Sequence, residues 1–479
     1  MASRAPLPKV EERPTRVRYW VIVFAVTLAI VTYIDRVCIS FAALSMRKDL
    51  GLDAVQMGKV FSAFILAYAL FEVPGGYLGD VMGPRKVLMR IVLAWSFFTA
   101  ATGWVWSYGS LLITRFLFGV GEAGCFPNLT KAFTTWLPAK ERVRAQSILW
   151  LSARWGGAFT PPLVAALIAW VGWRHSFEIF GSLGVIWAVV FYMWYRDNPL
   201  SHPKMNQGEK DLLEDSAKMA SGHGNVPWGV FLRSRQVWML CWQYFCLSYG
   251  WYFYLTWLPT YLREGRHLEN LSTAWLSVIP LLFGGLGNPA CFLAAGPLTK
   301  ITGSVAQTRR VMAYIGFAGA SGFLLLSTRV DDPTLAMIAI GLASFSNDLV
   351  MPGSWATAMD VGGKYAGTLS GSMNMMGNLA GGVAPVAVGY ILKFTDHNWR
   401  ITFWVSAAIY LLGALCWKWI DPVTPLEKTE PESPRRIRGC HYMRIVSTPC
   451  AWKRVSFGIL LLFIPKLVKD RMLTNGVGS

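Results

Sequence analysis

The sequence predicts an all-α polytopic membrane protein with twelve transmembrane helices in two six-helix halves. The chain of 479 residues is 54% hydrophobic and only 15% charged, whereas soluble domains carry about 25% charged residues. Apolar runs long enough to cross a bilayer follow one another along most of the chain. One long polar stretch, residues 197–235, separates the first six of these runs from the last six.

The apolar runs have about twenty residues or more, the length that an α-helix needs to cross the hydrocarbon core. They lie near residues 19–44, 56–78, 86–106, 109–131, 142–170, 176–196, 236–262, 273–298, 309–328, 333–357, 365–393 and 400–420. The predicted organisation is therefore a tail (1–18), a six-helix half (19–196), a central loop (197–235), a second six-helix half (236–421) and a C-terminal tail (422–479).

The placement of Lys and Arg predicts which side of the membrane each loop faces. Arg85 and Lys86 follow the second run, Arg144 follows the fourth, and the central loop is also basic. Because cytoplasmic loops carry an excess of Lys and Arg, both termini are expected in the cytoplasm. Short loops and the lack of a eukaryotic targeting signal favour a bacterial inner membrane. The apolar segment 455–468 in the tail is too short to span, so this tail is expected to be surface-bound or disordered.

Composition and spacing argue against several other classes of protein. The net charge of +18 is what basic cytoplasmic loops produce, so nucleic acid is not an expected partner. The eight cysteines are scattered without a CxxC pair or a Cys/His ligand spacing, so neither disulfides, nor a metal, nor a cofactor is expected. No nucleophile elbow or P-loop indicates an enzyme, and no segment is large enough for the output domain of a receptor.

The stretch GGYLGDVMGPRK follows the second run and carries a set of structural residues, namely Gly76, Asp80, Gly83, Arg85 and Lys86. Small glycines let two helices approach closely, and Asp80 can face a helix N-terminus and a nearby arginine. The stretch resembles the signature of the loop between helices 2 and 3 in the major facilitator superfamily. Arg144, in the next basic loop, is assigned to the same structural and gating set.

Three further stretches resemble the anion:cation symporter branch of that superfamily. They are YIDRVCISFA in the first run, RFLFGVGEAGCFPN in the fourth and GWYFYLTWLPTYL in the seventh. That branch includes bacterial hexuronate, glucarate and galactonate symporters, together with sialin and the vesicular glutamate carriers. The resemblance covers the chain to about residue 421. It implies an alternating-access carrier of organic anions, often coupled to protons, in which the first and fourth helices line a central cavity.

The first and fourth runs each carry an acid and an arginine, although a charge at the centre of a membrane helix costs about 2.5–3.5 kcal/mol. Arg115 and Glu122 are seven residues apart and share one helix face, and Asp35 and Arg36 are neighbours. The resemblance implies that Asp35 and Glu122 carry protons while Arg36 and Arg115 serve substrate binding and gating. Static ion pairs between helices are the alternative. All six histidines lie in loops or at helix ends, so carboxylates are expected to handle the proton.

Other polar residues within the runs extend the candidate substrate site. Arg154 and the neighbours Asn347 and Asp348 are either substrate ligands or, for Arg154 and Asp348, a mutually neutralising pair between the halves; a pair that forms in only one state would be a gate. Asn374 and Asn378 share a helix face and could orient hydroxyl groups or pack helices.

Aromatic residues and one further acid complete the set. Tyr33 resembles a substrate-lining tyrosine of the family. Tyr249, Trp251, Tyr252 and Tyr254 in the seventh run could stack on a sugar ring or belong to an interfacial aromatic belt. Glu72 is expected to be structural.

The expected function is secondary active transport of an organic anion, most simply a sugar acid such as a hexuronate, aldonate or aldarate, by proton-coupled symport. The expected partners are this anion, the proton and the lipid bilayer, and the chain is expected to act as a monomer. A facilitator or anion exchanger of the same fold remains an alternative. A sodium-coupled carrier of dicarboxylates or aromatic acids is another, because fold alone does not settle function.

Overall fold

The computed structural model describes residues 12–220, 226–266, 270–396 and 398–426. The chain divides into two units, residues 1–428 and 429–479, and everything below concerns the first. The predicted C-terminal tail, from residue 427 onward, lies outside the described residues. Those residues are almost wholly helical and contain no β-strand, which agrees with the predicted fold class.

The first half contains six helices, α1 to α6, three of which depart from the predicted runs. Its helices are α1 (Trp20–Leu50), α2 (Ala54–Met82), α3 (Pro84–Gly103), α4 (Tyr108–Glu122), α5 (Cys125–Trp136) and α6 (Ala139–Trp194), preceded by the short 3₁₀ helix η1 (Val17–Tyr19). The fourth run is broken between α4 and α5, where Gly124 has a φ of 85°. The fifth and sixth runs form α6, which is interrupted at Gly172 with a φ of 78°.

The central polar stretch folds against the first half. It contains η2 (Pro199–Ser201), α7 (Gln207–Ala220) and α8 (Trp228–Arg233). Glu209 of α7 is fully buried. It pairs with Arg18 at 3.0 Å and accepts a hydrogen bond of 2.6 Å from the hydroxyl of Thr15. Arg18 also pairs with Glu141 of α6 at 3.0 Å, so this buried network fastens α7 and the start of α1 to the same bundle.

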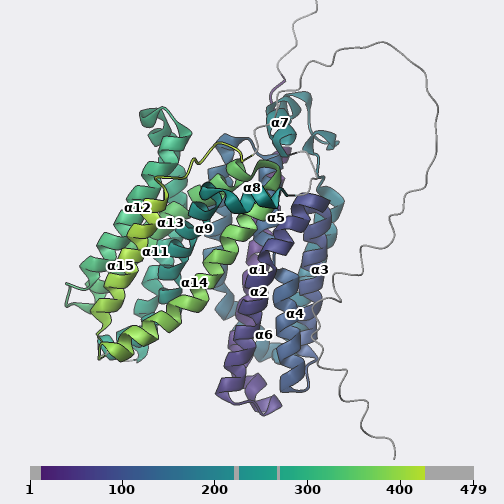
Figure 1. Ribbon diagram of the computed structural model, residues 1–479. Helices are drawn as coiled ribbons and strands as arrows, with labels where there is room; N and C mark the ends of the chain where they lie inside the picture. Colours follow the sequence, from purple (N-terminus) through teal and green to yellow (C-terminus); the bar gives the residue numbers. More distant parts are fainter. Residues whose placement is uncertain (1–11, 221–225, 267–269, 397, 427–479) are drawn as a thin grey trace, which may run out of the picture. The chain divides into compact units, whose positions relative to one another are not determined.

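The second half repeats the pattern. Its elements are α9 (Arg235–Thr256), α10 (Leu258–Thr260), the π-helical turn η3 (Tyr261–Gly265), α11 (Asn270–Thr302), α12 (Val305–Ser327), α13 (Pro333–Gly362), η4 (Gly363–Tyr365), α14 (Ala366–Phe394) and α15 (Trp399–Cys416). Figure 1 shows α1–α6 gathered in one bundle and α9 and α11–α15 in another. The two bundles meet where α2 packs against α14 and where α6 packs against α11.

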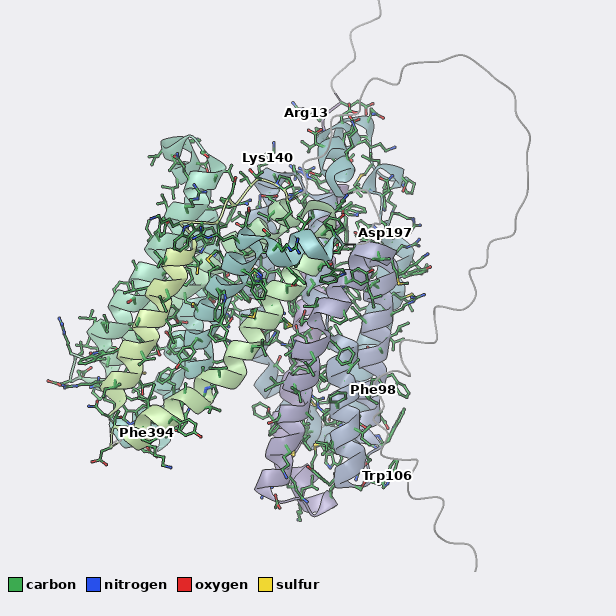
Figure 2. The ribbon with its side chains drawn as sticks, viewed as in Figure 1. Arg13, Phe98, Trp106, Lys140, Asp197 and Phe394 are labelled. Carbon is green, nitrogen blue, oxygen red and sulfur yellow. The ribbon has the colours of Figure 1, made fainter. Side chains whose placement is uncertain are left out.

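The outward faces of the helices are suited to lipid. Many large apolar side chains are exposed, including Leu66, Ile113, Ile186, Leu293 and Leu412, which water would disfavour but hydrocarbon accepts. By length and composition, eight stretches of the described residues are apolar enough to cross a membrane, and one of them, Pro333–Phe394, comprises both α13 and α14. Lys140 and Asp197 mark the end of the bundles near α7, and Trp106 and Phe394 mark the opposite end (Figure 2).

Candidate functional site

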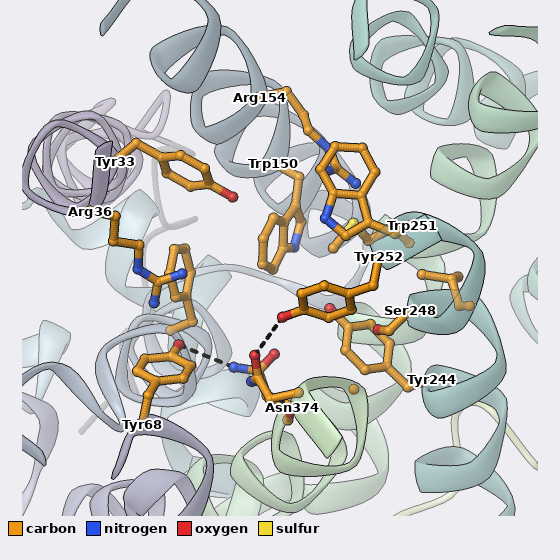
Figure 3. A pocket seen from close by; sticks show the side chains of 15 residues that line it. Tyr33, Arg36, Tyr68, Trp150, Arg154, Tyr244, Ser248, Trp251, Tyr252 and Asn374 are labelled. Carbon is orange, nitrogen blue, oxygen red and sulfur yellow. Dashed lines mark hydrogen bonds between the residues drawn. The ribbon is translucent and has the colours of Figure 1, made fainter. Parts of the chain in front are cut away.

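A cavity of about 80 Å³ lies between the two halves and is lined by polar and aromatic side chains from both. The first half contributes Tyr33, Arg36, Tyr68, Phe126, Trp150 and Arg154. The second half contributes Tyr244, Leu247, Ser248, Trp251, Tyr252, Met351, Asn374, Gly377 and Asn378. Figure 3 shows Arg36 and Arg154 on the first-half side and the aromatic residues of α9 opposite.

Arg36 of α1 lines the cavity and is paired with the carboxylate of Glu122, which is buried deeper in the protein. Its Nε donates a hydrogen bond of 2.6 Å to Oε1 of Glu122, and its side chain is 23% exposed whereas that of Glu122 is 1% exposed. The guanidinium stands over the Tyr68 ring at 4.5 Å from the centroid, a favourable cation–π arrangement. Its Nη2 is buried and has no hydrogen-bond partner, so one donor of Arg36 is left unpaired.

Asp35 and Arg115 belong to the same charged cluster but do not line the cavity. Asp35 and Arg115 are each 1% exposed. Both oxygens of Asp35 and two nitrogens of Arg115 lack hydrogen-bond partners. The carboxyl group interacts electrostatically with Arg115 and with Glu122, and Arg115 rests on the Phe118 ring at 4.1 Å. The four predicted charges therefore come together, with Arg36 at the cavity and the other three buried behind it.

Arg154 and Asp348 form an ion pair between the halves. Nε and Nη2 of Arg154 each donate a hydrogen bond of 2.8 Å to Asp348. The carboxylate also accepts from Asn288 at 3.2 Å and from Asn347 at 3.0 Å. The guanidinium lies over the Trp251 ring, 3.2 Å from the centroid. In this conformation the pair is formed. Arg154 lines the cavity, whereas Asn347 and Asp348 are buried beside it.

The two predicted asparagines lie on the cavity wall and connect it to both halves. The Asn374 amide donates to Glu72 at 2.8 Å and to the hydroxyl of Tyr68 at 3.3 Å. The Asn378 amide donates to the Asn374 carbonyl at 2.9 Å, and the Tyr252 hydroxyl donates to Asn378 at 3.0 Å. Figure 3 shows the contacts at Tyr68 and Tyr252 as dashed lines. These amides present both donors and acceptors to a bound molecule.

The predicted structural motif lies at the α7 end and joins the halves. Asp80 accepts hydrogen bonds from the backbone nitrogens of Gly367 at 3.0 Å and Thr368 at 2.6 Å, which belong to the first turn of α14. Its cation is Lys131 at 3.4 Å, not the expected arginine. A Cβ atom on Gly76 would overlap the carbonyl oxygen of Gly367, so glycine is required where α2 crosses α14.

The other residues of the predicted structural and gating set are Gly83, Arg85, Lys86 and Arg144. Gly83 has a φ of 86° at the start of α3, a conformation that favours glycine. Arg85 donates to the Tyr192 carbonyl at 2.7 Å and 3.0 Å and so ties α3 to α6. Lys86 is exposed. Arg144 is also exposed and stands over the Phe292 ring of α11 at 5.0 Å.

A second ion-pair cluster at the α7 end is absent from the predicted set. Asp360 of α13 pairs with Arg142 of α6 and with Arg309 of α12, the latter at 2.6 Å. Both arginines are at least 96% buried. Among the described residues, the polar contacts between the halves run from this cluster to the level of Arg154, and none lies beyond the cavity toward the opposite end. The two halves are therefore closed on each other at the α7 end.

Comparison with known proteins agrees with this architecture. The sequence model described as Major Facilitator Superfamily matches residues 25–385. The chain belongs to the major facilitator superfamily. A probable sulfoacetate transporter of Cupriavidus necator is 35% identical over 407 residues, which cover 84% of this chain and 94% of the relative. A probable galactarate/D-glucarate transporter of Escherichia coli is 30% identical, with 82% and 91% covered.

Solved structures support the same fold. The E. coli fucose:proton symporter aligns with a TM-score of 0.66 and 13% sequence identity, covering 84% of this chain and 99% of the other. These findings confirm the predicted fold class, the anion:cation symporter branch and the prediction that the chain is a transporter and not an enzyme. Transporters built from two such repeats bind substrate at the repeat interface near the midplane, and this cavity lies at the interface of the two halves.

Several residues that line the cavity were not predicted from the sequence, although their helical spacing from charged residues could have indicated them. Trp150 lies four residues before Arg154, and Tyr68 lies four residues before Glu72, so each shares a helix face with a charged residue. Of the four aromatic candidates in α9, Trp251 and Tyr252 line the cavity, whereas Tyr249 and Tyr254 are buried away from it.

Within the described part of the chain, no acidic, Cys and His side chains are grouped as a metal site would need.

Proposed function

We propose that this transporter carries a small organic anion by proton-coupled symport. The observation that carries the proposal is the pairing at the cavity: Arg36 and Arg154 both line it, and each is held by a buried carboxylate, Glu122 and Asp348. An anion that binds either guanidinium competes with that carboxylate. The released carboxylate then favours a proton, because it has lost its cation. Binding of the anion and binding of the proton are thereby linked.

Within this proposal the predicted residues take separate roles. Asp35 and Glu122 carry protons, and Arg36 and Arg154 contact the anion directly. Arg115 influences the anion site through Glu122. Asn374 and Asn378 orient polar groups of the anion, while Tyr33 and the aromatic residues of α9 cover its apolar parts. Asn347 and Asp348 hold Arg154 until the substrate arrives.

The substrate class follows from the lining and from the relatives. Guanidinium groups recognise carboxylates and sulfonates, and amides recognise hydroxyl groups, so sugar acids fit the cavity chemistry. The named substrates of the relatives include sulfoacetate, galactarate and D-glucarate. Because the cavity is narrow in this conformation, a two-carbon sulfonate requires less rearrangement than a six-carbon aldarate. Both therefore belong in the first substrate panel.

We infer the state of the transport cycle from the closed α7 end and from the proposed orientation of the chain in the membrane. With both termini in the cytoplasm, the α7 end is cytoplasmic and the described conformation is closed on that side. A bacterial inner membrane and a functional monomer complete the proposal. Alternating access then requires that the Asp80 and Asp360 contacts break when the cavity opens inward.

Uptake by proteoliposomes tests this function. Sulfoacetate, D-glucarate, D-galactonate and D-galacturonate would be offered with an inward proton gradient, with and without a protonophore and with sodium replaced by choline. We expect concentrative uptake of one of these anions that the protonophore abolishes and sodium does not affect. Uptake that only equilibrates, whatever the gradient, would indicate a facilitator or exchanger. Dependence on sodium would indicate the alternative coupling ion.

A further inference from the structure

Glu72 is a buried acid for which the proposed mechanism has no use. It lies in α2 and is fully buried. Its Oε1 accepts the hydrogen bond of 2.8 Å from Asn374 of α14, while Oε2 has no hydrogen-bond partner. Since Asn374 lines the cavity, Glu72 stands directly behind the cavity wall and links the two halves.

The charges around the cavity do not balance. Four buried carboxyl groups meet three guanidinium groups; the acids are Asp35, Glu72, Glu122 and Asp348, and the cations are Arg36, Arg115 and Arg154. Glu122 and Asp348 have ion-pair partners, and Asp35 interacts electrostatically with Arg115. Among the described residues, Glu72 has no cation within 4.0 Å. It is therefore the carboxyl group left over when the others are matched.

The groups that face Glu72 from the surrounding helices do not compensate for this charge. Those that interact with it are Tyr68 of its own helix, Arg36 of α1, Glu122 of α4, Cys125 of α5, Tyr252 of α9 and Asn374 of α14. Arg36 is the single cation in this set, and Glu122 already binds it at 2.6 Å. A buried carboxylate without a close cation is unfavourable, and an anion entering the cavity would add repulsion.

We propose that Glu72 is a third proton-carrying acid of the transport site, protonated whenever the cavity holds its anion. This inference rests on the proposed function. The proton comes from water on the open side and adds to the carboxylate at Oε2, where a donor is then available, while Oε1 keeps its bond to Asn374. No other covalent bond changes. When α2 and α14 separate at the cytoplasmic end, Glu72 loses the Asn374 contact, meets water and releases the proton.

A purely structural Glu72 would behave differently from a proton carrier. A permanent hydrogen bond to Asn374 needs only an acceptor at this position, which a glutamine supplies equally well. Infrared spectroscopy distinguishes the two roles, because a protonated carboxyl group has a carbonyl-stretch band that neither a carboxylate nor an amide shows. The probe is the reconstituted full chain, titrated with pH and then mixed with sulfoacetate.

Three variants are compared with the wild type, one as the test and two as controls. Glu72→Gln removes the carboxyl group but keeps the acceptor, and Glu72→Asp keeps a titratable group that is one methylene shorter. Glu178→Gln removes an acid just after the interruption of α6 at Gly172; this acid binds His175 and Trp104 and does not line the cavity. We expect the carboxyl band that sulfoacetate induces at constant pH in the wild type to lose one carboxyl equivalent in Glu72→Gln and to keep it in Glu72→Asp and in Glu178→Gln.

The outcomes separate this inference from the proposed function. If sulfoacetate induces the same band in Glu72→Gln as in the wild type, Glu72 takes up no proton when the anion binds, and the inference is wrong. A band that is lost in Glu72→Gln supports the inference, and in coupled proteoliposomes the variant should then move one proton fewer per anion. If wild-type uptake ignores the proton gradient, the proposed function fails, whereas the infrared titration still reports whether Glu72 takes up a proton.

Discussion

Each arginine at the cavity is restrained by an acid that lies deeper in the protein. Glu122 holds Arg36, and Asp348 holds Arg154. Each cation is thus kept in place, and one buried nitrogen of Arg36 has no hydrogen-bond partner. Removing one partner of a buried ion pair costs about 3–5 kcal/mol because the other charge is left unpaired. Single substitutions at these positions should therefore affect both stability and transport, and the two effects must be measured separately.

Glu122→Gln should uncouple transport from the proton gradient. The glutamine still accepts a hydrogen bond from Arg36 but cannot release a proton, so anion exchange should persist while concentrative uptake falls to the equilibrium level. Counterflow and gradient-driven uptake would be compared in the same proteoliposomes, with Glu178→Gln as the control. If Glu122→Gln still accumulates the anion like the wild type, Glu122 takes no part in coupling. The same comparison applies to Asp35→Asn.

Arg36→Lys should weaken anion binding while the charge is kept. A lysine cannot bind Glu122 and an anion with separate nitrogens of one planar group. A hydrogen bond to a charged group is worth about 1.5–3 kcal/mol, which corresponds to roughly a 10- to 100-fold loss of affinity. Binding would be measured by calorimetry with the anion selected in the uptake panel. Unchanged affinity would mean that Arg36 does not contact the anion.

At the scale of whole helices, a buried ion pair beside the cavity joins α6 to α13. Arg154 and Asp348 are almost completely buried and form two hydrogen bonds across the halves. Two single substitutions, Arg154→Gln and Asp348→Asn, each leave a buried charge unpaired, whereas the double variant leaves none. We expect each single variant to lower the Tm and the double variant to recover most of that loss.

Transport by the same variants separates the two interpretations of this pair. If Arg154 also binds the anion, the double variant should be stable and yet inactive. If the pair serves only to neutralise its own charges, the double variant should transport. A double variant that is less stable than either single one would contradict the pairing itself.

The helices and the charged residues could be predicted from the sequence for the same physical reason. Every predicted run overlaps a helix of the structure, and the charges within the runs stood out because the membrane interior penalises them. The break between α4 and α5 was missed, because nothing near Gly124 indicates that Gly75 packs against it. Tyr68 and Trp150 were missed because an aromatic residue in a membrane helix can equally face lipid, core or cavity.

The cation of Asp80 shows where sequence spacing stops being informative. An arginine was expected beside it, but Lys131 of α5 occupies that position. Which basic residue reaches Asp80 depends on how α5 turns after Gly124 and on how α14 begins, and neither follows from the motif. For the same reason Arg144 was assigned to the gate, whereas Arg142, two residues earlier, is the one that is buried and paired.

For the whole molecule, the polar contacts at the α7 end set the balance between its conformations. Asp360 is shared by two arginines, and Asp80 binds the first turn of α14. Both contacts join elements that must separate if the cavity opens at this end. A conformational equilibrium of this kind shifts tenfold for each 1.4 kcal/mol, so one buried ion pair is enough to control it.

Asp360→Asn should shift the equilibrium toward the conformation that is open at the α7 end. Spin labels at the exposed positions Lys86 and Lys300, in a chain without native cysteines, would report the distance between the halves. We expect the variant to gain a population with a longer distance. Glu214→Gln breaks the exposed pair with Lys218, which should contribute little, and serves as the control. Identical distance distributions in the wild type and in Asp360→Asn would contradict this assignment.

The contact between Gly76 and Gly367 has a practical use. Since the two glycines meet through their backbones, no side-chain rotation can make room for an added methyl group. An alanine at either position would therefore keep α2 and α14 apart. Such a chain should be unable to close fully at the α7 end, while the cavity keeps its native residues. That would provide a conformationally locked antigen for raising state-specific antibody fragments, and a means of imaging the conformation that is open at the α7 end.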